Sequence, residues 1–294
     1  MTALHDPTES TDTRRPAPAI ATALRKLTPA AWFGLVIITL YGLIALLAPV
    51  IAPYGQTEVV SPVPYGPWSE QFIFGTDQLG RDILSRLIYA ARNTIAISLA
   101  ATLITFAIGI TLGMIAAVLG GIVDIVISRI VDAIMALPQL VVILVMLSVV
   151  GSSIVNLIIV IGIADATNVF RLARTVSRNV AAMDYIEDAR LRGESLSWIV
   201  FREVLPNIVP TLVAEFGMRF CFVVLTVSAL SFLGLGIQPP TADWGSMVRE
   251  NATLISYGDI TPLLPAIAIA VLAIGVNFVV DWFLHHASGL RDDQ

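Results

Sequence analysis

Residues Asp184–Asn207 read DYIEDARLRGESLSWIVFREVLPN. This stretch carries eight charged side chains, Arg178 lies just upstream of it, and long apolar runs flank it on both sides. Charged groups are costly inside a lipid bilayer, so a charged segment between two apolar runs belongs in water. We expect this segment to be the place where a soluble partner acts on a membrane-embedded protein.

The composition of the whole chain is typical of a membrane protein. It has 294 residues, of which 56% are hydrophobic and 13% charged, with a mean hydropathy of +0.84. Soluble domains carry roughly 25% charged residues, whereas apolar runs of about 20 residues are typical of transmembrane helices. The net charge of −5 argues against binding to nucleic acid.

Six apolar runs predict an all-α, polytopic membrane protein with six transmembrane helices. The runs lie at residues 31–53, 94–119, 130–150, 154–170, 208–235 and 262–284. Residues 1–27 are polar and rich in proline and threonine, and we interpret them as a cytoplasmic tail. Twelve basic residues fall on the side of that tail and four on the other, which fits the positive-inside rule. The rule places both termini and residues 184–206 in the cytoplasm.

Five ionisable residues fall within the expected spans or near their ends. They are Asp132, Asp165, Glu215, Arg219 and Asp281. An ionisable residue inside a membrane is a candidate for a role in transport. Glu215 and Arg219 have the i, i+4 spacing of an intrahelical ion pair, with the acid first. The pair therefore has two interpretations, a structural one and a role in the substrate pathway.

Two local patterns modify this picture. Pro138 lacks a backbone N–H and should kink the third run. Upstream of the second run, Leu79, Ile83, Leu87 and Ala90 recur on one face of a helix. Such a helix either lies in the outer membrane interface or forms a surface that docks a substrate-delivering protein.

The sequence lacks the motifs of an enzyme. A P-loop requires a lysine followed by serine or threonine, and the only lysine, Lys26, is followed by leucine. Cys221 is the only cysteine, and no clustered set of metal ligands arises from His5, His285 and His286. We therefore expect this chain to bind no metal or cofactor and to hold no catalytic residue. Any energy for transport must come from another chain.

Within the charged stretch, the residues from Glu187 to Pro206 resemble the EAA loop of ABC importer permeases. The pattern of that loop is EAA, three residues, glycine, nine residues, isoleucine, one residue and Leu-Pro. The matching residues are Glu187, Ala189, Gly193, Leu205 and Pro206. Asp188 replaces the first alanine, and Glu203 replaces the isoleucine. The resemblance implies that this loop docks on an ATPase and carries its motion into the membrane.

The residue types suit such a loop. The small Ala189 would let a short helix sit deep in a groove of its partner. Gly193 has no Cβ and permits a turn that other residues disfavour. Pro206 would end the short helices and begin the fifth span, where its missing N–H costs nothing.

The resemblance extends over nearly the whole chain from about residue 30. The matching stretches are LLAPVIAPYG, FGTDQLGRDILSRLIYAARNT, VDAIMALPQL and LSFLGLGIQPPTADWGSMV. They are similar to the C-type permease of importers for dipeptides, oligopeptides, nickel, glutathione and opines. One departure precedes the last stretch, where Val227-Ser228 stand at a place that is often acidic in relatives.

The resemblance implies a type I ABC importer transmembrane domain over residues 28–294, with a coupling loop at 184–206. The implied partners are a homologous B-type permease, two ABC ATPase subunits that use ATP and Mg, and an extracytoplasmic solute-binding protein, at the inner membrane of a bacterial cell. The residues expected to couple to the ATPases are Asp184, Glu187, Asp188, Ala189, Arg192, Gly193, Leu205 and Pro206. Those expected to dock the binding protein are Asp77, Arg81, Asp82 and Trp244.

Two other functions stay open from the residues alone. An ion-coupled secondary transporter would use the five ionisable residues of the spans as a proton or ion relay. A membrane scaffold without transport would use the charged stretch only to recruit a partner. No inverted repeat is visible in the sequence, which weakens the first alternative. The identity of the solute does not follow from the sequence.

Overall fold

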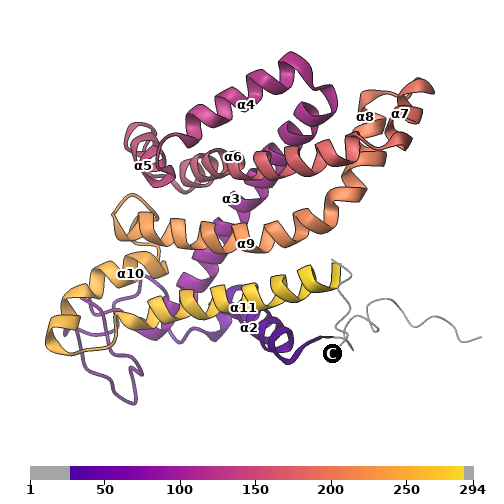
Figure 1. Cartoon of the computed structure of the whole chain (residues 1–294). Coiled ribbons are helices and arrows are strands. Elements are labelled where there is room, and N and C mark those ends of the chain that lie inside the picture. Colours follow the sequence, from indigo (N-terminus) through magenta and orange to yellow (C-terminus); the bar gives the residue numbers. More distant parts are fainter. Residues whose placement is uncertain (1–26, 288–294) are drawn as a thin grey trace, which may run out of the picture.

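The computed structural model describes residues 27–287 of the chain (Figure 1). Its elements are α2 (Pro29–Ile51), α3 (Ile83–Leu119), α4 (Gly121–Met135), α5 (Gln139–Val150), α6 (Ile154–Ala181), α7 (Asp184–Leu191), α8 (Leu196–Trp198), the π-helical η1 (Ile199–Val204), α9 (Leu205–Phe232), α10 (Trp244–Asn251), the 3-10 helix η2 (Ala252–Tyr257) and α11 (Leu263–Ala287). Within residues 27–287 the fold is all-α, as expected. Apart from residue 27, the expected N-terminal tail lies outside the described residues.

Five helical segments of this part of the chain are long and apolar enough to cross a membrane. They are α2, α3, α6, α11 and the continuous helical segment from α8 through η1 to the end of α9. A sixth span is formed if α4 and α5 are taken together, although they are bent by 87° at the break between them. Six spans are therefore found, as expected, when the broken pair is counted as one, and the third is broken rather than merely kinked.

The break in the third span follows from one residue. Pro138 stands directly before α5, and α4 ends at Met135 with Ala136 as its C-cap. Proline has no N–H to donate, and its ring clashes with the carbonyl four residues earlier, so a helix cannot pass through it undistorted. The break leaves polar Gln139 at the first position of α5.

The second span begins earlier than the apolar run suggests. The helix expected in the interface at residues 79–93 is instead the first part of α3, which starts at Ile83 and continues to Leu119. Asp82 caps it, because its carboxylate accepts a hydrogen bond from the Ser85 backbone N–H at 2.8 Å. Arg81, Asp82 and Arg86 of this segment are paired within the chain, so the helix need not lie flat in the interface.

Helices α3 and α6 form the most extensive contact in the bundle, and their backbones approach closely. A Cβ added at Gly109 would lie 2.7 Å from the Val169 Cβ, and one added at Gly113 would lie 2.8 Å from the Ala173 Cβ. Small residues at such crossings let two backbones approach closely, which is the usual basis of helix association in lipid. The core around these helices is otherwise built from valine, leucine and isoleucine.

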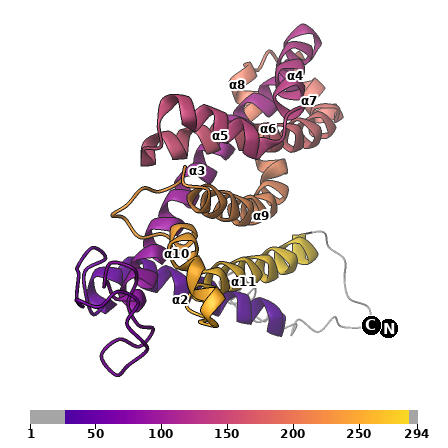
Figure 2. The same ribbon diagram turned by 90° about the vertical axis from the view of Figure 1, so that its left-hand side faces the viewer.

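The polar parts of the chain lie at the two ends of α9. Helices α7 and α8 lie at its N-terminal end, and α10 lies beyond its C-terminal end (Figures 1 and 2). We call residues 52–82 together with residues 243–262, which include α10 and η2, the cap. A soluble partner at one end of α9 is therefore connected to the other end only through the membrane-spanning helices.

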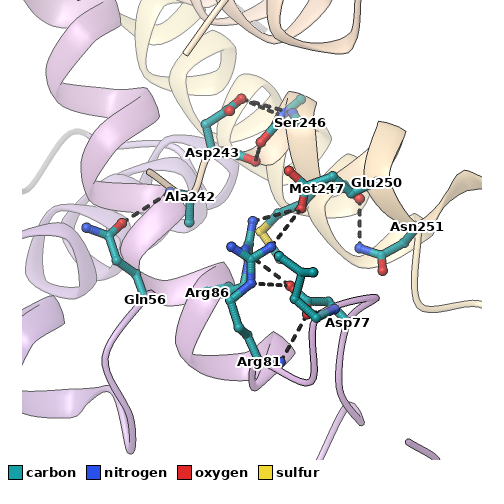
Figure 3. A network of polar contacts seen from close by, with 12 residues as sticks. Gln56, Asp77, Arg81, Arg86, Ala242, Asp243, Ser246, Met247, Glu250 and Asn251 are labelled. Atoms are coloured by element: carbon teal, nitrogen blue, oxygen red, sulfur yellow. Dashed lines mark hydrogen bonds and ion pairs between the residues drawn. The ribbon is translucent and has the colours of Figure 1, made fainter. Parts of the chain in front are cut away.

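Four buried charged residues hold the cap on the bundle. Arg86 on α3 contacts Asp77 at 3.1 Å and Glu250 of α10 at 2.9 Å. Arg81 donates to Asp77 at 2.7 Å and lies 3.4 Å from Glu250. Figure 3 shows Arg86 reaching between the loop and α10. We call Asp77, Arg81, Arg86 and Glu250 the polar clamp, a set of two acids and two bases.

A larger residue at the α3–α6 crossing should destabilise the bundle. The Gly109→Val variant would force the helices apart, because its Cβ meets the Val169 side chain, and such overpacking costs about 1–3 kcal/mol. The measurement is the thermal unfolding temperature of the purified protein. The control is Gly42→Val, since a Cβ at Gly42 of α2 meets nothing within 4 Å. An equal temperature for both variants would contradict the close contact.

Loss of the central arginine of the polar clamp should loosen the cap. The Arg86→Met variant leaves two buried carboxylates short of one cation, and breaking a buried ion pair on one side costs about 3–5 kcal/mol. The measurement is again thermal unfolding, combined with limited proteolysis of residues 52–82. Arg92→Gln, which removes an exposed arginine on the same helix, is the control. Unchanged protease resistance in Arg86→Met would contradict the role of the clamp.

Candidate coupling and pathway sites

Helix α7 presents its acids outward and packs its apolar face inward. Ile186 and Ala189 are fully buried, in a cluster with residues of η1 and the end of α3. Of the residues that the sequence analysis assigned to coupling, Ala189 is buried and Leu205 is half-buried. The others are exposed, namely Asp184, Glu187, Asp188, Arg192, Gly193 and Pro206. The interpretation of Ala189 is therefore corrected. Its small side chain lets α7 pack closely on its own chain, and it is not available to a partner's groove.

The turn after α7 depends on Gly193. Its φ is +79°, the left-handed region that glycine adopts without penalty. Its N–H donates to the Arg190 carbonyl at 3.0 Å, and the Glu194 N–H donates to the Ala189 carbonyl at 3.1 Å, which closes the end of the helix. A Cβ at this position would meet nothing within 4 Å. The requirement for glycine is thus one of backbone conformation, and the surrounding space is open.

Two side chains brace α7 against the rest of the bundle. Arg190 donates to the carbonyl of Val118 at 3.0 Å, in the last turn of α3. A cation there also offsets the partial negative charge of a helix C-terminus. On the other side, Asn207 of α9 donates to the hydroxyl of Tyr185 at 3.2 Å. The sequence showed these residues as part of a charged stretch, but their partners are distant in the chain and could not be foreseen.

The short helix after α7 runs directly into α9. Helix α8 has three residues, capped by Ser195, and is followed without interruption by η1 and then α9. Pro206 is at the second position of α9, so it does not end the short helices as expected. A π-helical segment in this place absorbs an extra residue within a continuous helix, as is common at functional positions. A push on α7 and α8 therefore acts directly on the start of α9.

Several apolar side chains accompany the acids on this surface. Leu191 at the end of α7 is 80% exposed, and Met183 and Phe201 are also exposed. A cavity of about 300 Å³ lies beside them, lined by residues that include Met183, Glu187 and Leu191. Exposed apolar groups next to charged ones are typical of a protein–protein contact. Leu191 was missed by the sequence analysis, because an isolated leucine within a helix reads as a core residue.

Three of the five ionisable residues of the spans come together near the middle of the bundle. Arg219 donates to Glu215 at 2.5 Å, which is the expected i, i+4 pair of α9. The Arg219 guanidinium also lies 3.5 Å from Asp165 of α6. Asp165 accepts hydrogen bonds from Asn168 at 2.9 Å and from Gln139 at 3.3 Å. We call Asp165, Glu215, Arg219, Gln139 and Asn168 the polar cluster. It joins α6, α9 and the broken third span.

The other two ionisable residues lie elsewhere. Asp132 of α4 is exposed and lines a cavity with Arg171 and Arg174 of α6. Asp281 of α11 is exposed, and its backbone carbonyl contacts His285. Arg174 forms an ion pair with Asp124, which ties α4 to α6. A relay through all five residues, as a secondary transporter would need, is therefore not formed in this conformation.

The residues expected to dock a binding protein lie inside the cap. Asp77, Arg81, Asp82 and Trp244 are all at most 4% exposed. The first two belong to the polar clamp, Asp82 caps α3, and Trp244 donates to the Leu87 carbonyl at 3.3 Å. Their assignment to docking is corrected, because a partner cannot reach side chains that the chain itself covers. These residues hold the cap in place, and any contact with a partner must be made by other residues.

Asp243 gives the cap a further buried carboxylate. Its Oδ1 accepts hydrogen bonds from the backbone N–H groups of Gly245 and Ser246 and so caps α10. Burial raises the pKa of this carboxyl above its usual value, and the hydrogen bonds from Ser246 partly offset that rise. Helix α10 therefore begins at a buried anchor, which fixes where it lies against α3.

Comparison with known families identifies the class of protein to which the chain belongs. Residues 109–288 match the family described as binding-protein-dependent transport system inner membrane component. Residues 26–66 match the N-terminal transmembrane domain of oligopeptide transport permease C. The first match covers more than half of the chain and includes α6 to α11, which carry the charged segment at residues 184–206 and most of the polar cluster.

Curated relatives cover nearly the whole chain. The dipeptide transport system permease protein DppC of Haemophilus influenzae is 31% identical over 268 residues, which is 89% of this chain and 88% of the relative. The di/tripeptide transport system permease protein DppC of Pseudomonas aeruginosa is 34% identical over 265 residues, 88% of this chain and 85% of the relative. The glutathione transport system permease protein GsiD of Pectobacterium atrosepticum is 34% identical over 227 residues, 77% of this chain and 73% of the relative.

Membership of this family explains why the sequence has no nucleotide-binding motif, because the ATPase of such importers is a separate subunit. The chain therefore belongs to the family of binding-protein-dependent transport system inner membrane components, and it is a multi-pass permease subunit of an ABC importer.

Proposed function

We propose that this chain forms half of a translocation pathway for short peptides or a related small solute and is driven through α7. The observation that carries the coupling role is the continuous helix from α8 to the end of α9, with α7 packed on its η1 segment. At 1.5 Å per residue, Arg219 lies about 20 Å along this helix from η1. A movement of α7 therefore reaches the polar cluster through one rigid element.

The proposed source of the movement is a pair of ATPase subunits that bind ATP and Mg, while this chain binds neither. The acids of α7 and the exposed Leu191 supply a mixed charged and apolar contact for one of them. A B-type permease would pair with this chain, and the exposed apolar faces of α2, α4 and α5 are available for it and for lipid. In this proposal both termini and α7 face the cytoplasm of the bacterial cell, in keeping with the distribution of basic residues.

The cap supplies the surface for an extracytoplasmic binding protein in this proposal. The polar clamp holds the cap from within, and its outer surface carries Trp68, Ile73, Tyr257 and Ile260, all exposed. Tyr257 is 86% exposed at the end of η2. Aromatic side chains are enriched at protein interfaces, so these residues replace the buried ones as the docking candidates.

The substrate class is proposed from the relatives, whose names refer to dipeptides, di/tripeptides and glutathione. All three are peptides or peptide-like molecules with a free ammonium and a free carboxylate. Ion-coupled transport by this chain alone is the rival proposal. It predicts uptake into liposomes with an ion gradient and without ATP, whereas the importer requires the ATPases and the binding protein.

A substitution of Gly193 should uncouple ATP hydrolysis from uptake. Gly193→Val places a β-branched residue at φ +79°, so the turn after α7 must change and the helix can no longer meet the ATPase in the same way. We expect the complex still to reach the membrane, with uptake of labelled peptide reduced at least about tenfold relative to ATP hydrolysis. The measurement is the ratio of the two rates in proteoliposomes.

The control for that variant is Gly151→Val in the turn between α5 and α6. Gly151 also has a positive φ, +87°, and a Cβ there also meets nothing within 4 Å, so the substitution strains the backbone in the same sense. It differs in position, since it lies neither near α7 nor in the cap. Normal coupling in Gly193→Val, or equal uncoupling in both variants, would argue against a coupling role for the turn.

A further inference from the structure

We propose that the groove between α4 and α6 is a binding site for a zwitterionic short peptide on its way through the membrane. The site has two ends. Asp165, with Gln139 and Asn168, would receive the ammonium group of the peptide, and Arg171 would receive its carboxylate. This inference rests on the proposed import of peptides and adds the residues that would recognise the two ends of the solute.

The first end is a cavity at the break of the third span. It has a volume of about 290 Å³, close to the lower end of the range for small-molecule pockets, and lies where α4 ends and α5 begins. Gln139 and Asn168 contribute the polar part of its lining, and Met135, Pro138 and Val142 part of its apolar wall. The same two amides donate to Asp165 Oδ1, so the carboxylate stands directly behind the wall of the cavity.

The charge at this end is not balanced. Asp165 is 2% exposed, and its Oδ2 atom accepts no hydrogen bond from any residue in the described part of the chain. Arg219 donates to Glu215 at 2.5 Å and lies 3.5 Å from Asp165, so one guanidinium is shared by two carboxylates. A buried carboxylate short of a partner is unfavourable unless a cation or a hydrogen-bond donor arrives. An ammonium group supplies both.

The second end lies further along the same groove. A cavity of about 340 Å³ is lined by Asp132 and Ser128 of α4 and by Arg171 and Arg174 of α6. Arg174 is engaged by Asp124, whereas Arg171 forms no ion pair with any described residue. The Arg171 guanidinium contacts the sulfur of Met135 at 3.8 Å, and Met135 lines the first cavity. Arg171 therefore stands at the boundary between the two cavities, free to meet an anion.

The spacing of the two ends suits a short peptide. Asp165 and Arg171 are six residues apart on α6, which is about 9 Å along the helix axis. An extended chain spans about 3.3–3.6 Å per residue, so three residues reach about 10 Å. Each of Asp165, Asn168 and Arg171 is three residues from the next and lies about 60° further round the helix, so the three lead from the buried side of α6 to its exposed side. The groove thus offers a negative end and a positive end at the length of a tripeptide.

The test uses a reporter cysteine in the complete transporter. Cys221 is the only cysteine of this chain and is buried, so a Cys221→Ala, Val142→Cys variant carries one thiol of its own, at the wall of the first cavity. The complex of both permeases and both ATPases is placed in nanodiscs, and a thiol reagent labels the reporter. The probes are trialanine, N-acetyl-trialanine and trialanine amide, each tested for its ability to slow labelling.

We expect trialanine to protect the reporter and each blocked peptide to need at least about tenfold higher concentration, the effect of one lost charged contact. Asp165→Asn should remove the preference for trialanine over the N-acetyl form and keep the preference over the amide. Arg171→Gln should do the reverse. Arg129→Gln, which removes an exposed arginine of α4 that lines neither cavity, should change neither preference.

Each contrary result has a separate meaning. A loss of both preferences in Asp165→Asn would mean that the residue is only structural and would overturn the site. Equal protection of the reporter by all three peptides, with Asp165 and Arg171 unchanged, would also overturn the site. Normal ATP-driven uptake of trialanine with no protection would overturn the site alone and leave the proposed function standing. No ATP-driven uptake of trialanine would overturn both.

Discussion

The unbroken helix from Leu196 to Phe232 is the element on which the rest of the structure depends. It begins beside the acids of α7, passes through a π-helical segment and carries Glu215 and Arg219 into the middle of the bundle. Ile186 and Ala189 of α7 pack against the first turns of this long helix. The segment is helical throughout, with η1 and Pro210 as its irregular points, so it links the turns that contact α7 to Glu215 and Arg219. Transport by a chain without its own ATPase requires a connection of this kind.

Two buried sets of charges serve different purposes in this fold. The polar clamp pairs two arginines with two acids between the cap and α3, so its charges cancel and it is a structural element. The cluster of Asp165, Glu215 and Arg219 has one cation for two acids, and one carboxylate oxygen accepts no hydrogen bond in the described residues. An unbalanced set costs stability that a neutral one does not. Its position beside a cavity gives a physical reason for that imbalance.

The break at Pro138 places the polar cluster next to a cavity. An uninterrupted helix in this place would have satisfied all of its backbone groups and presented an apolar face to α6. The bend of 87° instead leaves space between α4 and α6 and turns Gln139 toward Asp165. Irregular backbone at membrane depth is tolerated where it is covered by protein or lines a polar cavity. The proline thus creates the cavity that the neighbouring polar residues line.

The sequence by itself determined the all-α membrane fold, the number of candidate spans when the broken pair is counted as one, the position of the charged segment and the need for glycine at 193. These features depend on apolar periodicity, on charge segregation and on the backbone of single residues, all of which are local. The tertiary structure alone decided which charged residues face a partner and which face the chain. Ala189, Asp77 and Trp244 were expected at surfaces and are buried, while Leu191 was unremarked and is exposed. Such burial depends on partners more than a hundred residues away, as for Arg86 and Glu250, and no local pattern records which distant side chain will meet which.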